Sequence, residues 1–171
     1  MRLLPHTERN AVATAPDTRM ATHAEARIAP SSPSIVLTHD GWLIGHLVDV
    51  EGRVIDALVG RDPIGLMTDD GYREVDRDDV LALVPPTALA RTELRIAKRQ
   101  IPVTVELGDF VSVTGNCHLL PGATVWDVWQ RSPSGFAALT EALLRFPDGS
   151  VETAEVVLVS RHAAATGLRR N

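Results

Sequence analysis

The sequence predicts a mainly β protein with short helices, in which one small module occurs twice after a disordered N-terminal tail. From Ser34 onward, apolar and polar residues often alternate, as expected for strands with one buried face. The stretches that begin at Trp42 and Val111 also share a pattern of strand, turn, short helix and further strands. The chain is therefore expected to contain a tandem repeat.

The two copies align on their glycines and on a few polar residues. The matched pairs are Gly45 with Gly115, Gly52 with Gly122 and, after a one-residue shift, Asp56 with Asp127, Thr68 with Thr140 and Arg77 with Arg161. No set of residues typical of a reaction centre repeats with them. The repetition predicts architecture and leaves the activity open.

Composition divides the chain into five segments. Residues 1–33 contain four prolines and no sustained apolar period, so we expect a disordered tail, although residues 19–28 could form a helix that docks on a partner. The first module spans 34–86 and the second 101–166. Residues 87–100 form a connector that is expected to be helical after a double proline, with an extended linker as the alternative. Residues 167–171 form a second tail.

In the first module, residues 34–40 and 41–50 read as two strands joined at Asp40 and Gly41. Val54, Ile55 and Leu58 recur at helical spacing, which predicts a helix of two turns ending at Gly60. Extended structure returns at residues 64–67. Further short strands lead to the double proline at 85–86, which should end strand pairing.

In the second module, residues 101–107 and 110–120 read as strands, and the second of these alternates cleanly between inward and outward positions. Thr124 and Asp127 have the spacing of a capping box that starts a short helix. Residues 136–146, the turn at 147–150 and residues 151–160 form a hairpin that is longer than its counterpart in the first module. Residues 159–165 are expected to close the module as a strand.

Each copy resembles the Sm-like, SH3-type small barrel in its bent second strand, with Gly45 or Gly115 at the bend, and in its closing segment. The resemblance implies two tandem small β-barrels. It does not imply RNA binding, because the Asn with an acidic neighbour that holds RNA in Sm-like proteins is absent, and that family also lacks the helix expected between the middle strands. Residues 101–165 also resemble a bacterial domain family of unknown function, through the turn from His118 to Gly122 and the helix containing Asp127.

Composition limits the classes of function. The chain has 171 residues, a net charge of -5 and 44% apolar residues, which is typical of a soluble protein. No secretory signal or membrane-spanning segment is recognisable, so the expected location is the cytoplasm. All but one of the 17 basic residues are arginine, a usage typical of bacteria with GC-rich genomes.

Charge is unevenly distributed. Residues 34–86 hold eleven acidic and four basic residues, whereas the connector carries a basic cluster, which consists of Arg91, Arg95, Lys98 and Arg99. One small cluster in an acidic chain makes general nucleic-acid binding unlikely as the main function. The favoured interpretation is that the cluster pairs with the acidic first module.

Candidate catalytic and metal-binding residues lack the spacing that their chemistry needs. The candidates are His39, His46, His118, His162, the lone Cys117, and the acidic residues Asp69, Asp70, Asp76, Asp78 and Asp79. No zinc, calcium, nucleotide or serine-hydrolase motif is present. We therefore predict no catalytic residues, no metal site and no cofactor. Arg77, Arg161, Asp56 and Asp127 are interpreted as structural caps or ion pairs, with a shared ligand site as the alternative.

The candidate interaction residues lie on the outer face of the first module. Where the second module places Ser112, Thr114, Asn116 and His118, the first has Trp42, Ile44, His46 and Val48. This apolar strip should be covered by the other module, by a second copy of the chain or by a partner. Trp126 and Trp129 raise the same question on the second helix, with core packing as the default.

These observations predict a non-catalytic protein-protein interaction or assembly module, with a protein partner or a homo-oligomer as the expected assembly. Two alternatives stay open at this point: an Sm-like nucleic-acid binder that uses the basic connector, and a small metal-dependent enzyme around His46 and the acidic run.

Overall fold

The computed structural model describes residues 32–50, 53–60, 63–86, 99–109 and 111–170. Its strands are β1 (Ser34–Thr38), β2 (Gly41–Leu47), β3 (Ile64–Thr68), β4 (Gly71–Val75), β5 (Val80–Val84), β6 (Arg99–Leu107), β7 (Val111–Leu119), β8 (Phe136–Arg145), β9 (Val151–Ser160) and β10 (Leu168–Arg170). The helices are α1 (Val54–Ala57), the 3-10 helix η1 (Arg77–Asp79), α2 (Val125–Gln130) and α3 (Arg161–Gly167). The prediction of a mainly β protein with short helices is confirmed.

The two copies of the module have the same order of elements. The first half comprises β1 to β5 with α1 and η1, and the second half comprises β6 to β10 with α2 and α3. In each half the fifth strand pairs with the first, followed by the second, third and fourth strands. The internal repeat seen in the sequence is thus reproduced in the topology.

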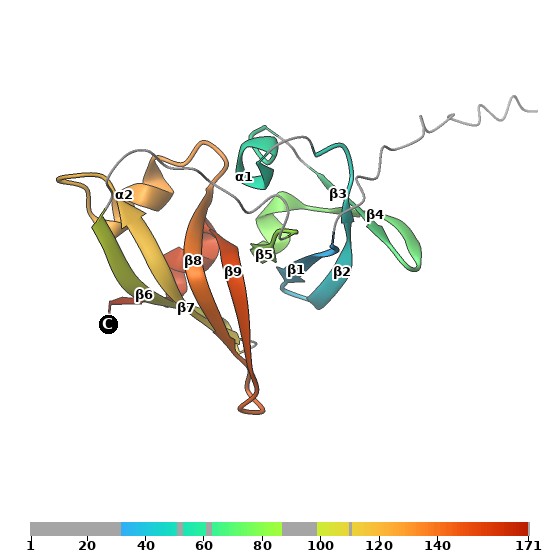
Figure 1. Ribbon diagram of the computed structural model, residues 1–171. Helices are drawn as coiled ribbons and strands as arrows, with labels where there is room; N and C mark the ends of the chain where they lie inside the picture. Colours follow the sequence, from blue (N-terminus) through green and yellow to red (C-terminus); the bar gives the residue numbers. More distant parts are fainter. Residues whose placement is uncertain (1–31, 51–52, 61–62, 87–98, 110, 171) are drawn as a thin grey trace, which may run out of the picture.

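One sheet of ten strands runs through both halves, in the order β10-β6-β7-β8-β9-β5-β1-β2-β3-β4 (Figure 1). The halves are joined where β5 pairs with β9, through Ala82 opposite Val159 and Leu83 opposite Leu158. Strands β10 and β4 lie at the two ends of the sheet. The sheet is therefore not closed into a barrel, and two separate closed barrels are not observed.

The apolar core extends across the junction. Leu37, Leu81 and Ala82 of the first half are buried in the cluster formed mostly by β6 to β9 and α2. Conversely, Phe136 and Leu158 of the second half are buried among residues of β1, β3, β5 and α1. Each half thus contributes side chains to the core of the other.

Gly45 and Gly115 occupy equivalent sites in the bent second strands. A Cβ atom at Gly115 would lie 3.0 Å from the Cβ of Leu139 and 3.1 Å from the carbonyl oxygen of Thr140. A Cβ atom at Gly45 would overlap the carbonyl oxygen of Met67. Close approach of the neighbouring strand explains why both positions lack a side chain.

The structure differs from the sequence-based assignment in the closing segments. Residues 161–165, predicted to be part of a strand, belong to α3 because the Ser160 hydroxyl accepts a hydrogen bond from the Ala163 N–H at 3.2 Å and the following alanines favour a helix. Arg99 and Gln100 belong to β6 rather than to the connector, and residues 168–170 of the expected tail pair with β6. The other connector residues and residues 1–31 lie outside the described part of the chain.

The helices are short. α3 has seven residues and α2 has six. None of the helices in the described ranges is long and apolar enough to cross a membrane.

Candidate functional site

An apolar hollow lies where the two halves meet, lined by residues of both. It has a volume of about 240 Å³. Its apolar lining comprises Ile35, Trp42, Ile44, Val84, Leu144 and Phe146. The first four come from the first half and the last two from the β8-β9 hairpin of the second. We call this surface the junction groove.

Strand register explains why the groove has an apolar wall on the side of the first half. Ile35 pairs with Ile44 across β1 and β2, and Thr104 pairs with Thr114 across the equivalent strands β6 and β7. The two threonine hydroxyls hydrogen-bond to each other at 2.9 Å. A half-buried polar pair in the second half is thus replaced by an isoleucine pair in the first.

The β8-β9 hairpin covers part of this apolar strip. The rings of Trp42 and Phe146 lie 5.7 Å apart in a tilted arrangement, a favourable distance for an aromatic pair. Ile44 keeps 60% of its surface exposed, whereas Val48 is buried. The predicted strip therefore divides into a covered end at Trp42, an open centre at Ile44 and a core residue at Val48.

A second hollow of about 570 Å³ continues from the junction groove along β9. Val84, Thr153 and Ala154 line both hollows. The second is also bordered by Pro85, by Glu141 and Leu143 of β8, and by Glu155 and Val156 of β9. Together they form one surface that follows β9 for several residues.

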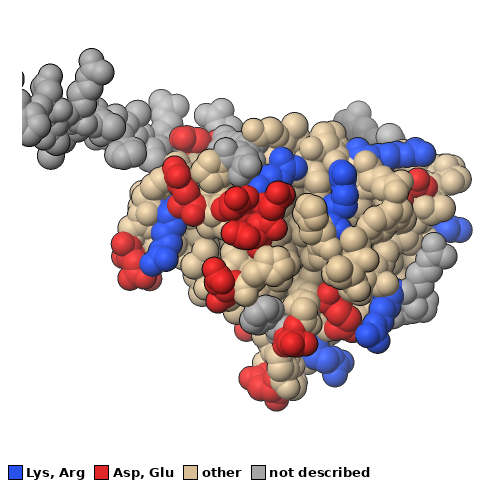
Figure 2. All heavy atoms as spheres, turned by 180° about the vertical axis from the view of Figure 1, so that it is seen from behind, with Lys and Arg blue, Asp and Glu red and all other residues tan. Residues whose placement is uncertain are grey.

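The charged residues that line the two hollows are all acidic. They are Glu141, Glu152 and Glu155, and neither hollow is lined by a described Lys or Arg. In the view from behind, acidic side chains also gather over the side of the molecule that carries β1 to β4 (Figure 2). The surroundings of the groove thus favour a positively charged occupant.

The histidines and the acidic run do not form a metal site. No group of three or more His, Cys, Asp and Glu residues within the described ranges is placed to hold a metal ion. His118 hydrogen-bonds to Thr140 at 2.7 Å, and His162 lies 3.6 Å from the exposed carboxylate of Asp78. His46 lies in β2, where its Nδ1 is buried without a hydrogen-bond partner. Cys117 is buried in the larger core cluster.

Trp126 and Trp129 differ in their surroundings. Trp129 is fully buried, and its indole N–H donates to the carbonyl oxygen of Val159 at 3.0 Å. Trp126 is half-buried and stacks on Trp129 with ring centroids 6.4 Å apart. Trp129 therefore has no surface for a partner in this structure.

Arg77 and Arg161 occupy the first positions of η1 and α3 rather than closing strands, yet they remain equivalent. Both guanidinium groups donate to carbonyl oxygens of one loop, Arg77 to Ser134 and Arg161 to Ser132, the latter at 3.2 Å. Arg77 also lies 6.0 Å from the ring centre of Phe136. Because Arg77 belongs to the first half and the loop to the second, this contact helps to hold the halves together.

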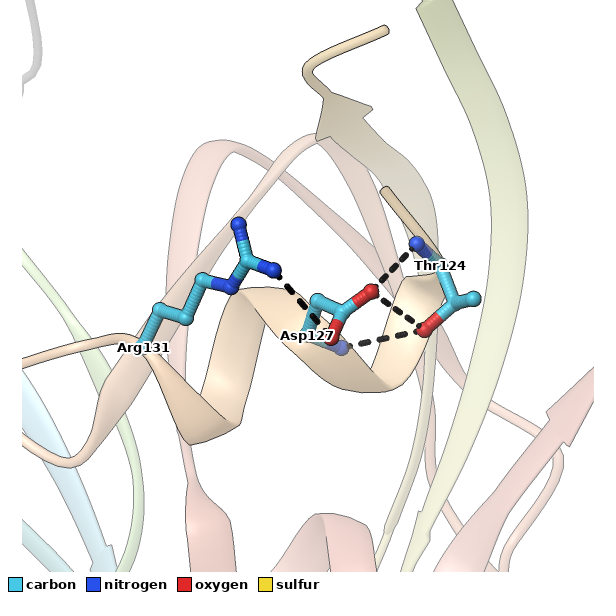
Figure 3. A network of polar contacts seen from close by, with 3 residues as sticks. All are labelled: Thr124, Asp127 and Arg131. Carbon is cyan, nitrogen blue, oxygen red and sulfur yellow. Dashed lines mark hydrogen bonds and ion pairs between the residues drawn. The ribbon is translucent and has the colours of Figure 1, made fainter. Parts of the chain in front are cut away.

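Asp127 caps α2, as its spacing predicts (Figure 3). Its carboxylate accepts hydrogen bonds from the Thr124 N–H at 2.7 Å and the Thr124 hydroxyl at 2.8 Å. These bonds lower the pKa of Asp127, and Arg131, 3.9 Å away, acts in the same direction. Asp56 makes no equivalent cap and lies 3.6 Å from Arg53.

The basic cluster is described only at its end. Arg99 is exposed at the start of β6, while Arg91, Arg95 and Lys98 lie outside the described residues.

The hairpin side of the groove was not identified from the sequence. Leu144 and Phe146 belong to a β8-β9 hairpin whose extra length was recognised, but not its packing against β2. Its length and its apolar residues near the tip were the available signals. The chain matches no protein-family model, and neither a curated protein nor a solved structure matches it.

Proposed function

We propose that this protein is a non-catalytic interaction module that binds a protein partner in the junction groove. The observation that supports this most strongly is the open end of the apolar strip, where Ile44 remains 60% exposed beside Leu144 and Val84. Exposed apolar patches rimmed by polar residues mark protein-protein interaction sites or ligand-binding grooves.

The contrast between the halves supports the same proposal. The strand position equivalent to Ile44 carries Thr114, which is hydrogen-bonded to Thr104. The β8-β9 hairpin covers Trp42, which accounts for the apolar character at that end of β2. It leaves Ile44 open, and contact with a partner would account for the isoleucine.

The test compares two exposed apolar residues. Ile44→Ser removes the open part of the groove, and Leu120→Ser is the matched control, because Leu120 is 48% exposed outside both hollows. Burying the exposed part of an isoleucine contributes about 1 to 2 kcal/mol, so Ile44→Ser should weaken partner binding roughly five- to thirtyfold.

Both variants are produced as the full chain and compared with the wild type in quantitative co-purification from the native host, followed by titration of the recovered partner. Loss of binding in Ile44→Ser alone is expected. Equal binding by the wild type and both variants would contradict the proposal, as would equal loss in Ile44→Ser and Leu120→Ser.

A further inference from the structure

Strand β9 has an edge that is paired over only a short part of its length. On one side it pairs with β8 from Phe136 opposite Ser160 to Arg145 opposite Val151, with an interruption at Glu141 and Glu155. On the other side it pairs with β5 only at Leu158 and Val159. No described residue pairs with that side of β9 over residues 151–157.

The reason for the early stop lies in the sequence of the first half. Continuing the antiparallel register of β5 and β9 would place Pro85 opposite Val156. Proline has no N–H to donate and cannot continue a ladder of hydrogen bonds. Pro85 lines the hollow beside β9 but cannot extend the pairing, so β5 supplies no hydrogen-bond partner to the edge of β9 beyond Leu83.

The unpaired edge borders the candidate site. Thr153, Ala154 and Glu155 line the hollow beside it, and Glu152, Thr153 and Ala154 line the junction groove. An extended peptide placed along this edge would meet backbone donors and acceptors on one side and the apolar surface of Ile44 and Val84 next to it. This combination is what strand addition requires.

The charges define the chemistry of the peptide. Glu152 and Glu155 of β9 and Glu141 of β8 are exposed, and no described basic residue lines either hollow. Alternate side chains of a strand point to opposite faces, so Glu152 and Glu155 flank the edge of β9 on its two faces. A peptide that alternates apolar and basic residues would present one set to the groove and carry positive charge along this acidic edge.

We propose that the partner binds by adding a strand to the edge of β9 at residues 151–156, which no described residue pairs with, through a segment in which apolar and basic residues alternate. This inference rests on the proposed function, since it specifies how the junction groove is used.

The probe is the synthetic peptide KVKVKVK, titrated against the full chain by calorimetry and by NMR. We expect saturable binding, slower hydrogen exchange of the β9 amides, and an affinity that falls with added salt. The acidic peptide EVEVEVE should bind at least tenfold more weakly. In the protein, Glu152→Lys combined with Glu155→Lys should reduce binding of KVKVKVK about tenfold, because two attractions become repulsions.

Backbone methylation tests the strand directly. In an extended peptide the N–H groups of the lysines and those of the valines face opposite edges. Strand addition therefore predicts that methylating one set of backbone nitrogens abolishes binding and methylating the other set leaves it within about threefold. Equal tolerance of both sets, or binding without protection of β9 amides, would overturn strand addition.

The outcomes separate this inference from the proposed function. If the native partner binds and is lost in Ile44→Ser, while KVKVKVK does not bind, the strand proposal is wrong and the groove remains the binding site. Sedimentation tests whether the full chain self-associates. If it does, and Glu152→Lys combined with Glu155→Lys abolishes the self-association, the occupant of the edge is a second copy of this chain and the proposal of a separate partner is wrong. If Ile44→Ser leaves partner binding unchanged, the proposed function itself is wrong.

Discussion

The two halves place different side chains at the same positions of one topology. In the second half, β6 and β7 present a hydrogen-bonded pair of threonines on their outer face, whereas β1 and β2 of the first half present two isoleucines at the groove. The second half also has the longer third and fourth strands, each of ten residues against five. The halves are therefore complementary, since the longer hairpin of one covers part of the apolar strip of the other.

The difference has an energetic reason. A repeat that stands alone must keep its outer strands polar, whereas a repeat that packs against a neighbour can bury apolar residues there. Trp42 contacts Phe146, and Leu37 of β1 is fully buried among residues of the second half. Divergence between the copies thus follows from their contact with each other, and only the open end at Ile44 is unaccounted for within the described chain.

The largest effect is expected from truncating the residues that anchor the two helices. Trp129 and Leu58 are both buried, on α2 and just after α1 respectively. Trp129→Ala should lower the free energy of unfolding by about 4 kcal/mol, because it creates a cavity and leaves the Val159 carbonyl without its indole donor, and Leu58→Ala by about 3 kcal/mol.

The free energy of unfolding of Trp129→Ala and Leu58→Ala is measured by chemical denaturation, followed by circular dichroism. Because each half contributes side chains to the core of the other, both variants should show one transition that shifts as a whole. Two separate transitions, with each substitution moving only one of them, would mean that the halves are independent.

Replacing Gly45 or Gly115 by alanine should lower the free energy of unfolding by an intermediate amount, and the loss should differ between the two positions. Gly45→Ala forces a Cβ into a backbone carbonyl oxygen, whereas at Gly115 the nearest atoms, the Leu139 Cβ and the Thr140 carbonyl oxygen, lie at 3.0 Å and 3.1 Å and need to shift only slightly. We expect losses of about 3 and about 1 kcal/mol respectively, within the range for overpacking. Thermal unfolding of both variants provides the comparison, and a greater loss for Gly115→Ala would show that the bends are not as described.

A smaller effect distinguishes the starts of α1 and α2. Thr124→Ala removes the cap of α2 and should cost about 1 kcal/mol. At the equivalent site of α1, Arg53 makes no side-chain cap, and Asp56 lies in the first turn. Arg53→Thr should rebuild the capping box and stabilise the protein by about 0.5 kcal/mol. The denaturation midpoints of Thr124→Ala and Arg53→Thr are compared with that of the wild type. Destabilisation by Arg53→Thr would show that the two helix starts are not interchangeable.

The pH dependence of the cap should be the smallest effect. Hydrogen bonds from Thr124 lower the pKa of Asp127, so its contribution to stability is complete above the unfolded-state pKa and is lost as the pH falls through the lower folded-state pKa. Asp127→Asn should therefore lose less stability than the wild type between about pH 5 and about pH 3. Parallel acid titrations of the two proteins would show this, and identical curves would contradict the assigned role of Asp127.

Local features of this fold could be predicted from the sequence, and distant pairings could not. Gly45 and Gly115 marked the places where a neighbouring strand approaches closely, and the spacing of Thr124 and Asp127 identified the cap of α2. The pairing of β5 with β9 joins residues more than seventy positions apart, and no local pattern specifies it. Aligning Arg161 with Arg77 of the first copy predicted a strand after Ser160, although the serine and the alanines that follow it are typical of the start of a helix.

The candidate site could be predicted only in part, because one side of it depends on a pairing of strands that are distant in the sequence. Comparing the two copies identified Trp42 and Ile44 as positions that had become apolar. It did not identify Leu144 and Phe146, because their place opposite β2 depends on the junction of the sheet. Val48 was expected on the outer strip and is buried, since β2 ends at Leu47 and the chain turns inward there.

The most direct test of the account is photo-crosslinking from two positions that the register makes equivalent. A photoreactive amino acid replaces Ile44 in one variant and Thr114 in the other, and both are expressed as the full chain in the native host. We predict that position 44 crosslinks to a partner protein and that position 114 does not. Equal crosslinking from both positions, or crosslinking from position 114 alone, would contradict the assignment of partner binding to the first half.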